Sequence, residues 1–121
     1  MLSIINYLGE IMIYVYGIPN CGSVKKARQV LEQHNVAYTF TDFKKTPPTN
    51  EQIEDWLHKV GVEKLINQKG TKWRTLTDEE KQLPAKTVIA LHPTVIKRPL
   101  IEWEDGKITV GFDEDDILRR I

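Results

Sequence analysis

The chain of 121 residues is poor in cysteine, and Cys21 is the only one. A single thiol cannot form a disulfide within the chain, so the fold needs no oxidising compartment. The first eleven residues are too few to span a bilayer, which takes about 20 consecutive apolar residues. We therefore expect a cytoplasmic protein without a membrane partner.

An excess of charge of either sign is also missing, since 17 lysine and arginine residues balance 17 aspartate and glutamate residues. A neutral chain has no electrostatic footprint for nucleic acid, and we expect no such partner. The three histidines are scattered, and none has the spacing to Cys21 of a Cys–His dyad. No metal cluster is indicated either, so no metal site is predicted.

The length fits one compact domain, and the 40% share of hydrophobic residues is enough for a core. Residues 1–11 lack the positive region and cleavage site of a signal peptide. The first expected strand begins directly after Met12. We therefore interpret residues 1–11 as an N-terminal extension, with Met12 as an alternative start, and residues 12–121 as a single domain.

Hydrophobic periodicity predicts a βαβ unit in the first part of the domain. Residues 13–16 form an apolar run typical of a buried strand, and residues 22–34 alternate an apolar stripe with a charged face, as an amphipathic helix does. Asn35 can end this helix, and residues 36–41 follow as a second strand. The crossover favours parallel pairing of the two strands.

After the βαβ unit the sequence predicts several helices. A hairpin and a final helix are predicted to follow them. Two capping-box patterns, Thr49 with Gln52 and Thr77 with Glu80, indicate helix starts. Asp105-Gly106 is a hairpin signal. The expected elements are helices over 50–60 and 62–67, a basic loop over 69–74, a third helix that stops at Pro93, an extended run over 97–103, a strand over 107–112, and a helix capped by Asp113.

Cys21 lies between the first strand and the first helix, where a thiol is easily ionised. The free N–H groups of the first helical turn, together with Lys25, would favour its thiolate form. Gly22 keeps the backbone free of side-chain bulk, so an anion could approach the same N–H groups. The alternative is that Cys21 is a small buried hydrophobic residue. The position favours the reactive thiol.

Two further features have simple interpretations when taken alone. Arg98-Pro99 suits a surface arginine followed by a trans proline at the start of a strand, because only about 5% of X–Pro bonds in folded proteins are cis. Lys69 and Arg74 belong to the basic loop, which could bind an anion. A solvated loop is the simpler interpretation.

Several segments together resemble the arsenate reductase-like ArsC/Spx/YffB superfamily. The Gly-Thr-x-Trp-Arg stretch is most similar to the YffB branch. The resemblance covers nearly everything from Met12 onward. The segments that carry it are residues 16–21, 25–27, 65–67, 70–74, 97–100 and 111–112.

This resemblance implies an α/β, thioredoxin-like fold with βαβ and ββα halves and a helical insertion between them. It also implies that Pro99 is a cis-proline beside the active thiol, which would bring Arg98 next to Cys21. An arginine in that position could stabilise a thiolate or hold an oxyanion through two hydrogen bonds.

Departures from the family pattern bear on the function. Arsenate reductases of the family hold the oxyanion with three arginines, whereas no arginine lies between Arg98 and Arg119. Lys69 or Arg74 could replace a missing one, and the choice stays open. Val24 occupies the second position of the Cys-x-x-Cys switch found in Spx-type regulators, so no internal disulfide can form.

The resemblance thus implies a monothiol oxidoreductase with Cys21 as nucleophile and Arg98 as its partner. No bound cofactor is expected; glutathione would be the co-substrate, and glutathione or glutaredoxin the resolving partner. The alternative is an Spx-like transcriptional regulator that binds the RNA polymerase α-subunit without turnover. Arsenate reduction itself is not favoured.

Overall fold

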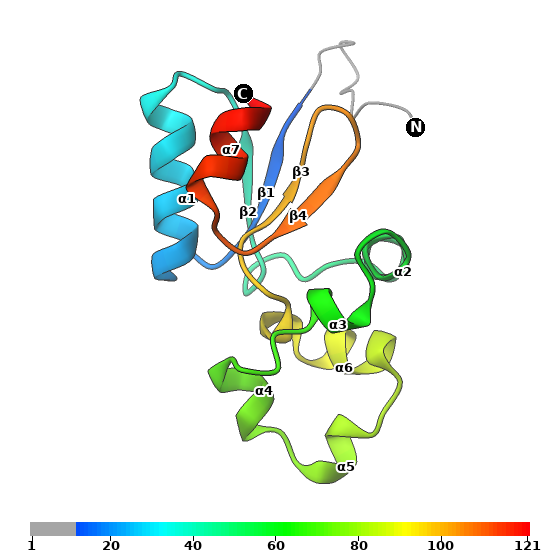
Figure 1. Cartoon of the computed structure of the whole chain (residues 1–121). Coiled ribbons are helices and arrows are strands. Elements are labelled where there is room, and N and C mark those ends of the chain that lie inside the picture. Colours follow the sequence, from blue (N-terminus) through cyan, green and yellow to red (C-terminus); the bar gives the residue numbers. More distant parts are fainter. Residues whose placement is uncertain (1–11) are drawn as a thin grey trace.

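A mixed four-stranded sheet forms the centre of the molecule (Figure 1). The computed structural model describes residues 12–121, so the interpretation of residues 1–11 as an extension lies outside the described residues. The strand order is β2-β1-β3-β4, with β1 parallel to β2 and antiparallel to β3, and β3 antiparallel to β4. The strands are β1 (Tyr14–Gly17), β2 (Thr39–Asp42), β3 (Leu100–Glu102) and β4 (Ile108–Val110). The predicted α/β fold with βαβ and ββα halves is confirmed.

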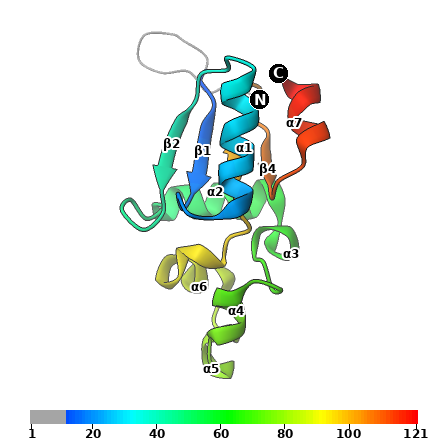
Figure 2. The ribbon, with the colours of Figure 1, turned by 90° about the vertical axis from the view of Figure 1, so that its left-hand side faces the viewer.

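Helices cover both faces of this sheet (Figures 1 and 2). Helices α1 (Gly22–Gln33) and α7 (Glu114–Arg120) pack on one face, and α2 (Asn50–Val60) packs on the other. Strand β1 and the residue before it explain this, because successive side chains point to opposite faces of a strand. Ile13 and Val15 belong to the cluster under α1 and α7, whereas Tyr16 packs in the cluster under α2.

The predicted helical insertion lies beyond one end of the sheet (Figure 1). After α2 it comprises α3 (Val62–Leu65), α4 (Thr71–Thr75), α5 (Asp78–Lys81), α6 (Ala85–Leu91) and the 3₁₀ helix η1 (Pro93–Val95). Its first and last parts pair with each other, since Asn67 N donates to Val95 O (2.8 Å) and Lys97 N to Leu65 O (2.8 Å). This pairing directs the chain straight into β3.

The expectation of a basic loop over residues 69–74 is wrong, because α4 begins within it. Asn67 forms a turn in which Lys69 N donates to its side-chain oxygen (3.3 Å) and Gly70 N to its carbonyl (3.0 Å). Arg74 N then donates to Gly70 O (3.2 Å), which starts the helix. The insertion therefore contains more helical segments than the three predicted.

Three strands, β2, β3 and β4, are shorter than predicted, and the first two are shortened for identifiable reasons. Val36 N donates to Leu31 O (2.9 Å) and Asn35 has φ of 56°, so residues 35 and 36 complete the end of α1. Lys97 is bonded to the insertion, and Trp103 already belongs to the hairpin turn, where it accepts from Gly106 N (2.9 Å). Strand β2 therefore starts three residues later than predicted and ends one residue later, and β3 is limited to the centre of its predicted run.

The predicted helix starts are confirmed in detail. Both capping boxes form, at Thr49 with Gln52 and at Thr77 with Glu80, and the Asp113 side chain accepts from Asp116 N (3.1 Å). Among residues 12–121, no helix has both the length and the apolar character needed to cross a membrane.

Candidate thiol site

Cys21 ends the turn that connects β1 to α1. Its N–H donates to Ile18 O (3.2 Å), and its own carbonyl accepts the first hydrogen bond of the helix, from Lys25 N (2.9 Å). The backbone of Cys21 is extended, with φ of −80° and ψ of 128°, so Cys21 occupies the N-cap position of α1. The residue is half-buried, and it is the free cysteine of the chain.

The close approach of α1 to β1 depends on a glycine that the sequence did not single out. A Cβ atom at Gly17 would lie 2.6 Å from Cγ2 of Val24, which is fully buried. Only a residue without a side chain therefore fits at the end of β1. Gly17 and Val24 together fix where the first turn of α1, and hence Cys21, meets the sheet.

The first turn of α1 is open to an anion. The Cys21 side chain makes no capping hydrogen bond, and the first turn contains no acidic residue. A Cβ atom at Gly22 would meet nothing within 4 Å, so neighbouring atoms do not crowd this residue, and its role in admitting an anion stays a prediction. Unpaired N–H groups and the helix dipole favour negative charge at such a place.

Arg98 and Pro99 reach the same end of the sheet. Tyr16 pairs with Leu100 in the antiparallel ladder of β1 and β3, so the residues before Leu100 lie where the β1–α1 turn begins. The Arg98–Pro99 peptide bond is cis, as the resemblance implied, and the interpretation as a trans proline is wrong. Arg98 is half-exposed and forms no salt bridge with any residue of 12–121.

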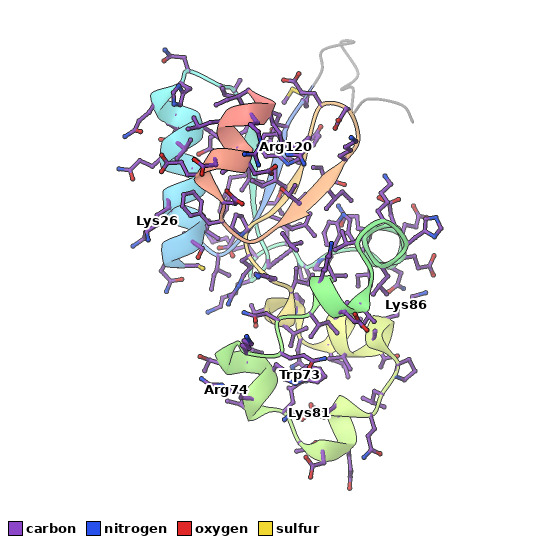
Figure 3. All side chains as sticks on the ribbon, in the orientation of Figure 1. Lys26, Trp73, Arg74, Lys81, Lys86 and Arg120 are labelled. Atoms are coloured by element: carbon purple, nitrogen blue, oxygen red, sulfur yellow. The ribbon has the colours of Figure 1, made fainter. Side chains whose placement is uncertain are left out.

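The other predicted anion-binding residues are more dispersed. Lys25 is exposed on the first turns of α1. Lys69 is exposed and lines a surface hollow together with Lys97, the residue before Arg98. Arg74 extends from α4 in the insertion, where it is exposed (Figure 3). The structure thus brings Cys21, Gly22, Arg98 and Pro99 to one end of the sheet. Lys69 and Arg74 lie instead on the exposed surface of the insertion.

A partly buried polar network supports the end of β1 from the α2 side. The Tyr16 hydroxyl donates to Glu102 Oε1 (2.6 Å), Trp56 Nε1 donates to Glu102 Oε2 (3.3 Å), and Gln52 Nε2 reaches the Tyr16 hydroxyl (3.4 Å). Burial, and then the neighbouring Glu102 carboxylate, raise the pKa of Tyr16 far above its ordinary value. Its phenol therefore stays neutral and fixes the strand that leads to Cys21. Partners 86 positions apart left no signal in the sequence.

A second missed contact lies beside Arg98. Gly111 has φ of 85°, and a Cβ atom there would lie 2.8 Å from Cε of Lys97. Gly111 N donates to Pro99 O (3.0 Å). The glycine therefore lets the Lys97 stem cross the end of β4. Its place in the Gly-Phe pair was the only signal available in the sequence.

A family model for the ArsC family matches residues 16–120. The chain belongs to the ArsC family. The match includes the β1–α1 turn with Cys21, the insertion, and the strand that follows Arg98-Pro99.

Several relatives of this ArsC-family chain match over most of their length. An uncharacterized protein of Haemophilus influenzae is 38% identical over 109 residues, covering 87% of this chain and 95% of the relative. Global transcriptional regulator Spx 1 of Oceanobacillus iheyensis is 30% identical, covering 89% and 86%. The solved structure of a YFFB protein has a TM-score of 0.84 and 33% identity, and covers 90% of this chain and 98% of that chain.

Proposed function

We propose that this ArsC-family protein is a monothiol oxidoreductase that uses Cys21 as nucleophile and glutathione, alone or through glutaredoxin, as the resolving thiol. The start of α1 is the observation that carries the proposal. A cysteine stands at the N-cap of a 12-residue helix that has neither a side-chain cap nor an acidic residue in its first turn. Such a helix end stabilises a thiolate.

The chemistry is thiol–disulfide exchange. The Cys21 thiolate attacks one sulfur of a mixed disulfide between a substrate thiol and glutathione, forming a Cys21–glutathione disulfide and releasing the substrate as thiolate. A second glutathione thiolate then attacks the glutathione sulfur of that adduct, which frees Cys21 and forms glutathione disulfide. The exchange balances, because one mixed disulfide is consumed and one glutathione disulfide forms: the substrate sulfur is reduced to its thiol while the single incoming glutathione thiol is oxidised. An external resolving thiol is required because the chain has no second cysteine.

Arg98 is proposed to stabilise the negative charge on sulfur in these steps. The pairing of Tyr16 with Leu100 brings it to the end of the sheet where the β1–α1 turn lies, and no salt bridge within residues 12–121 occupies its guanidinium. A guanidinium can donate several hydrogen bonds to one anion. Lys25, Lys69 and Arg74 are candidates for binding the charged ends of glutathione or of a substrate.

Alkylation kinetics test this proposal directly. At about pH 6.5, where free cysteine is mostly protonated, Cys21 should react with iodoacetamide about tenfold faster than N-acetylcysteine. Incubation with glutathione disulfide should add one glutathionyl group, visible by mass spectrometry. Arg98→Met should lose most of the rate advantage. Arg119→Met removes an exposed arginine on α7 and serves as the matched control.

The proposal fails if Cys21 reacts no faster than N-acetylcysteine and takes up no glutathione. If Cys21 is alkylated at the same rate in Arg98→Met and Arg119→Met, Arg98 does not stabilise the thiolate and that part of the proposal is wrong.

A second candidate function is transcriptional regulation through the RNA polymerase α-subunit. The likeness to the regulator Spx 1 of Oceanobacillus iheyensis, at 30% identity over 89% of this chain, favours it. A pull-down with the purified C-terminal domain of that subunit separates the two functions. Binding that persists in Cys21→Ser, together with no glutathione adduct in the wild type, would support the regulator and remove the thiol from the mechanism.

A further inference from the structure

Strand β4 is an edge strand whose outer side is unpaired. Lys107 O accepts from the β3 side at 2.8 Å, and Gly111 N donates to that side at 3.0 Å. In an antiparallel ladder the residues between alternate their direction, so the backbone N–H and C=O groups of Ile108 and Val110 point outward. Within residues 12–121, these outward groups make no hydrogen bond.

Three hollows follow this edge and form what we call the β4 groove. The central one, of about 320 Å³, lies between α2 and α3 on one side and α7 on the other. It shares Ile108 with a hollow of about 470 Å³ at the hairpin end, and Val110 with one of about 700 Å³ at the other end. Val60 and Ile117 give the central part apolar walls. Figure 2 shows β4 at the edge of the sheet, next to α7.

The β4 groove is basic, although the chain as a whole is neutral. Asp116 is bonded to Arg120 (2.9 Å), and Lys59 is bonded to Asp55 (3.2 Å). The other lysines that line the groove form no salt bridge within residues 12–121. The lining cations are Lys59, Lys64, Lys69, Lys97, Lys107 and Arg120, and the lining carboxylates are Glu63, Asp113 and Asp116.

This charge distinguishes between possible occupants. A second copy of the chain pairing edge to edge would bring two sets of the same lysines together, and lysines beside a short edge strand are a common protection against such self-association. An acidic segment would instead meet complementary charge at both ends of the groove, where the lining cations outnumber the lining carboxylates.

We propose that the β4 groove binds an extended acidic segment of a partner protein, which adds to the sheet as a fifth strand. The segment would hydrogen-bond to the backbone of Ile108 and Val110, place apolar side chains against Val60 and Ile117, and pair carboxylates with the lysines. Because Gly111 N bonds to Pro99 O, the Val110 end of the groove lies at the end of the sheet that holds Arg98. A bound segment therefore runs toward the thiol site.

A pair of short labelled peptides tests the proposal on the full chain. One alternates glutamate and valine, and the other alternates lysine and valine at the same length. Fluorescence anisotropy at low salt should show about tenfold tighter binding of the acidic peptide, with the difference falling as salt is added. Amide NMR shifts should be largest at Ile108 and Val110. An acidic peptide with N-methylated alternate residues should lose binding, because it cannot form the ladder.

Charge-reversal variants localise the interaction. Lys64→Glu with Lys107→Glu should weaken the acidic peptide about tenfold. The matched control is Lys26→Glu with Lys45→Glu, which makes the same change in net charge at exposed positions away from β4 and should leave binding unchanged. Figure 3 shows Lys26 pointing away from the sheet on α1.

Four results obtained with the full chain would overturn the proposal. The first is a lack of binding of the acidic peptide at about 1 mM, and the second is equal binding of both peptides. The third is a set of amide NMR shifts confined to another surface, and the fourth is a dimer in solution whose interface is β4. Binding that appears only after removal of residues 1–11 would overturn it as well, because a segment of the chain itself would then occupy the groove.

Discussion

Helices α1 and α2 are nearly equal in length and pack on opposite faces of the same sheet, yet they begin in opposite ways. Helix α2 starts with a complete capping box, in which the side chains of Thr49 and Gln52 satisfy each other's backbone N–H groups, and with an acidic residue in its first turn. Helix α1 starts at Cys21 with no side-chain hydrogen bond and no acidic residue.

The start of α2 contributes to stability, whereas the start of α1 leaves its N–H groups available for chemistry. A side-chain cap contributes about 1 kcal/mol to a helix, and an acidic residue in the first turn contributes a further fraction. Helix α1 lacks both contributions, and its packing holds it in place instead: Val24, Ala27 and Leu31 are fully buried. The N–H groups that a cap would use remain available to an anion, and the nearest side chain able to become one is Cys21.

The largest effect is expected from Cys21→Ser, which would give α1 a start resembling that of α2. Serine is a strong N-cap residue, whereas the cysteine makes no capping bond. The variant should lose glutathionylation and alkylation completely, while its free energy of unfolding stays equal or rises by up to about 1 kcal/mol. Mass spectrometry and urea denaturation measure the two effects separately.

Cys21→Ala is the matched control, since it removes the thiol without supplying a cap. If the serine variant proves less stable than the alanine variant, the start of α1 cannot accept a cap, and its contrast with α2 would have a different cause.

Gly17→Ala should give the next largest effect, by displacing α1 from the sheet. The new Cβ would meet Cγ2 of Val24 at 2.6 Å, and a buried β-branched side chain has little freedom to move away. We expect a loss of about 2 kcal/mol in the free energy of unfolding, typical of overpacking. Thiol reactivity should fall too, because the first turn of α1 shifts.

A double-mutant cycle with Val24→Ala identifies the cause. Shortening Val24 has a cost of its own, but Gly17→Ala should then add little further destabilisation. A full additional loss in the Val24→Ala background would mean that the strain at Gly17 arises elsewhere.

The contrast between the two helices was only half visible in the sequence. The capping box of α2 is a local pattern four residues long, and the amphipathic stripe of α1 spans two turns, so both were predicted correctly. The packing of Gly17 against Val24 depends on how closely a strand and a helix approach in three dimensions. No local pattern encodes that distance.

The candidate site shows the same division. Cys21 could be singled out because a lone thiol after a strand and before a helix is a local feature. Arg98 became a candidate only through the family resemblance, since 77 positions separate it from Cys21 and sheet register alone connects the two ends. Helix α4 was missed because five residues are too few to show periodicity. The turn at Asn67 and Gly70 was its only local signal.

Thr49→Ala should have a smaller effect, confined to α2. Removal of the capping oxygen leaves the Gln52 N–H without its 3.1 Å partner, at an expected cost of about 1 kcal/mol. Thr49→Ser keeps the oxygen and should retain most of that stability. The alkylation rate of Cys21 should not change in either variant, because the two helix starts act independently. A slower rate in Thr49→Ala, measured under native conditions, would show that they are coupled.

The smallest effect is expected at the second capping box, where α5 uses Glu80 in the position that Gln52 has in α2. The Thr77 N–H donates to the Glu80 carboxylate (3.0 Å) and His92 Nε2 lies 2.7 Å from it, and these contacts hold the pKa of Glu80 below its ordinary value. A lowered pKa in the folded state means that the carboxylate contributes stability above the ordinary pKa of glutamate, about 4.3, and that this contribution disappears as the pH falls through the lower folded value. Glu80→Gln should therefore lower the Tm slightly at neutral pH, with the difference from wild type vanishing in acid. Glu79→Gln, on the exposed surface of the same helix, is the control. A difference that grows toward low pH would contradict the assignment, because it would require Glu80 to be stabilising in its protonated form.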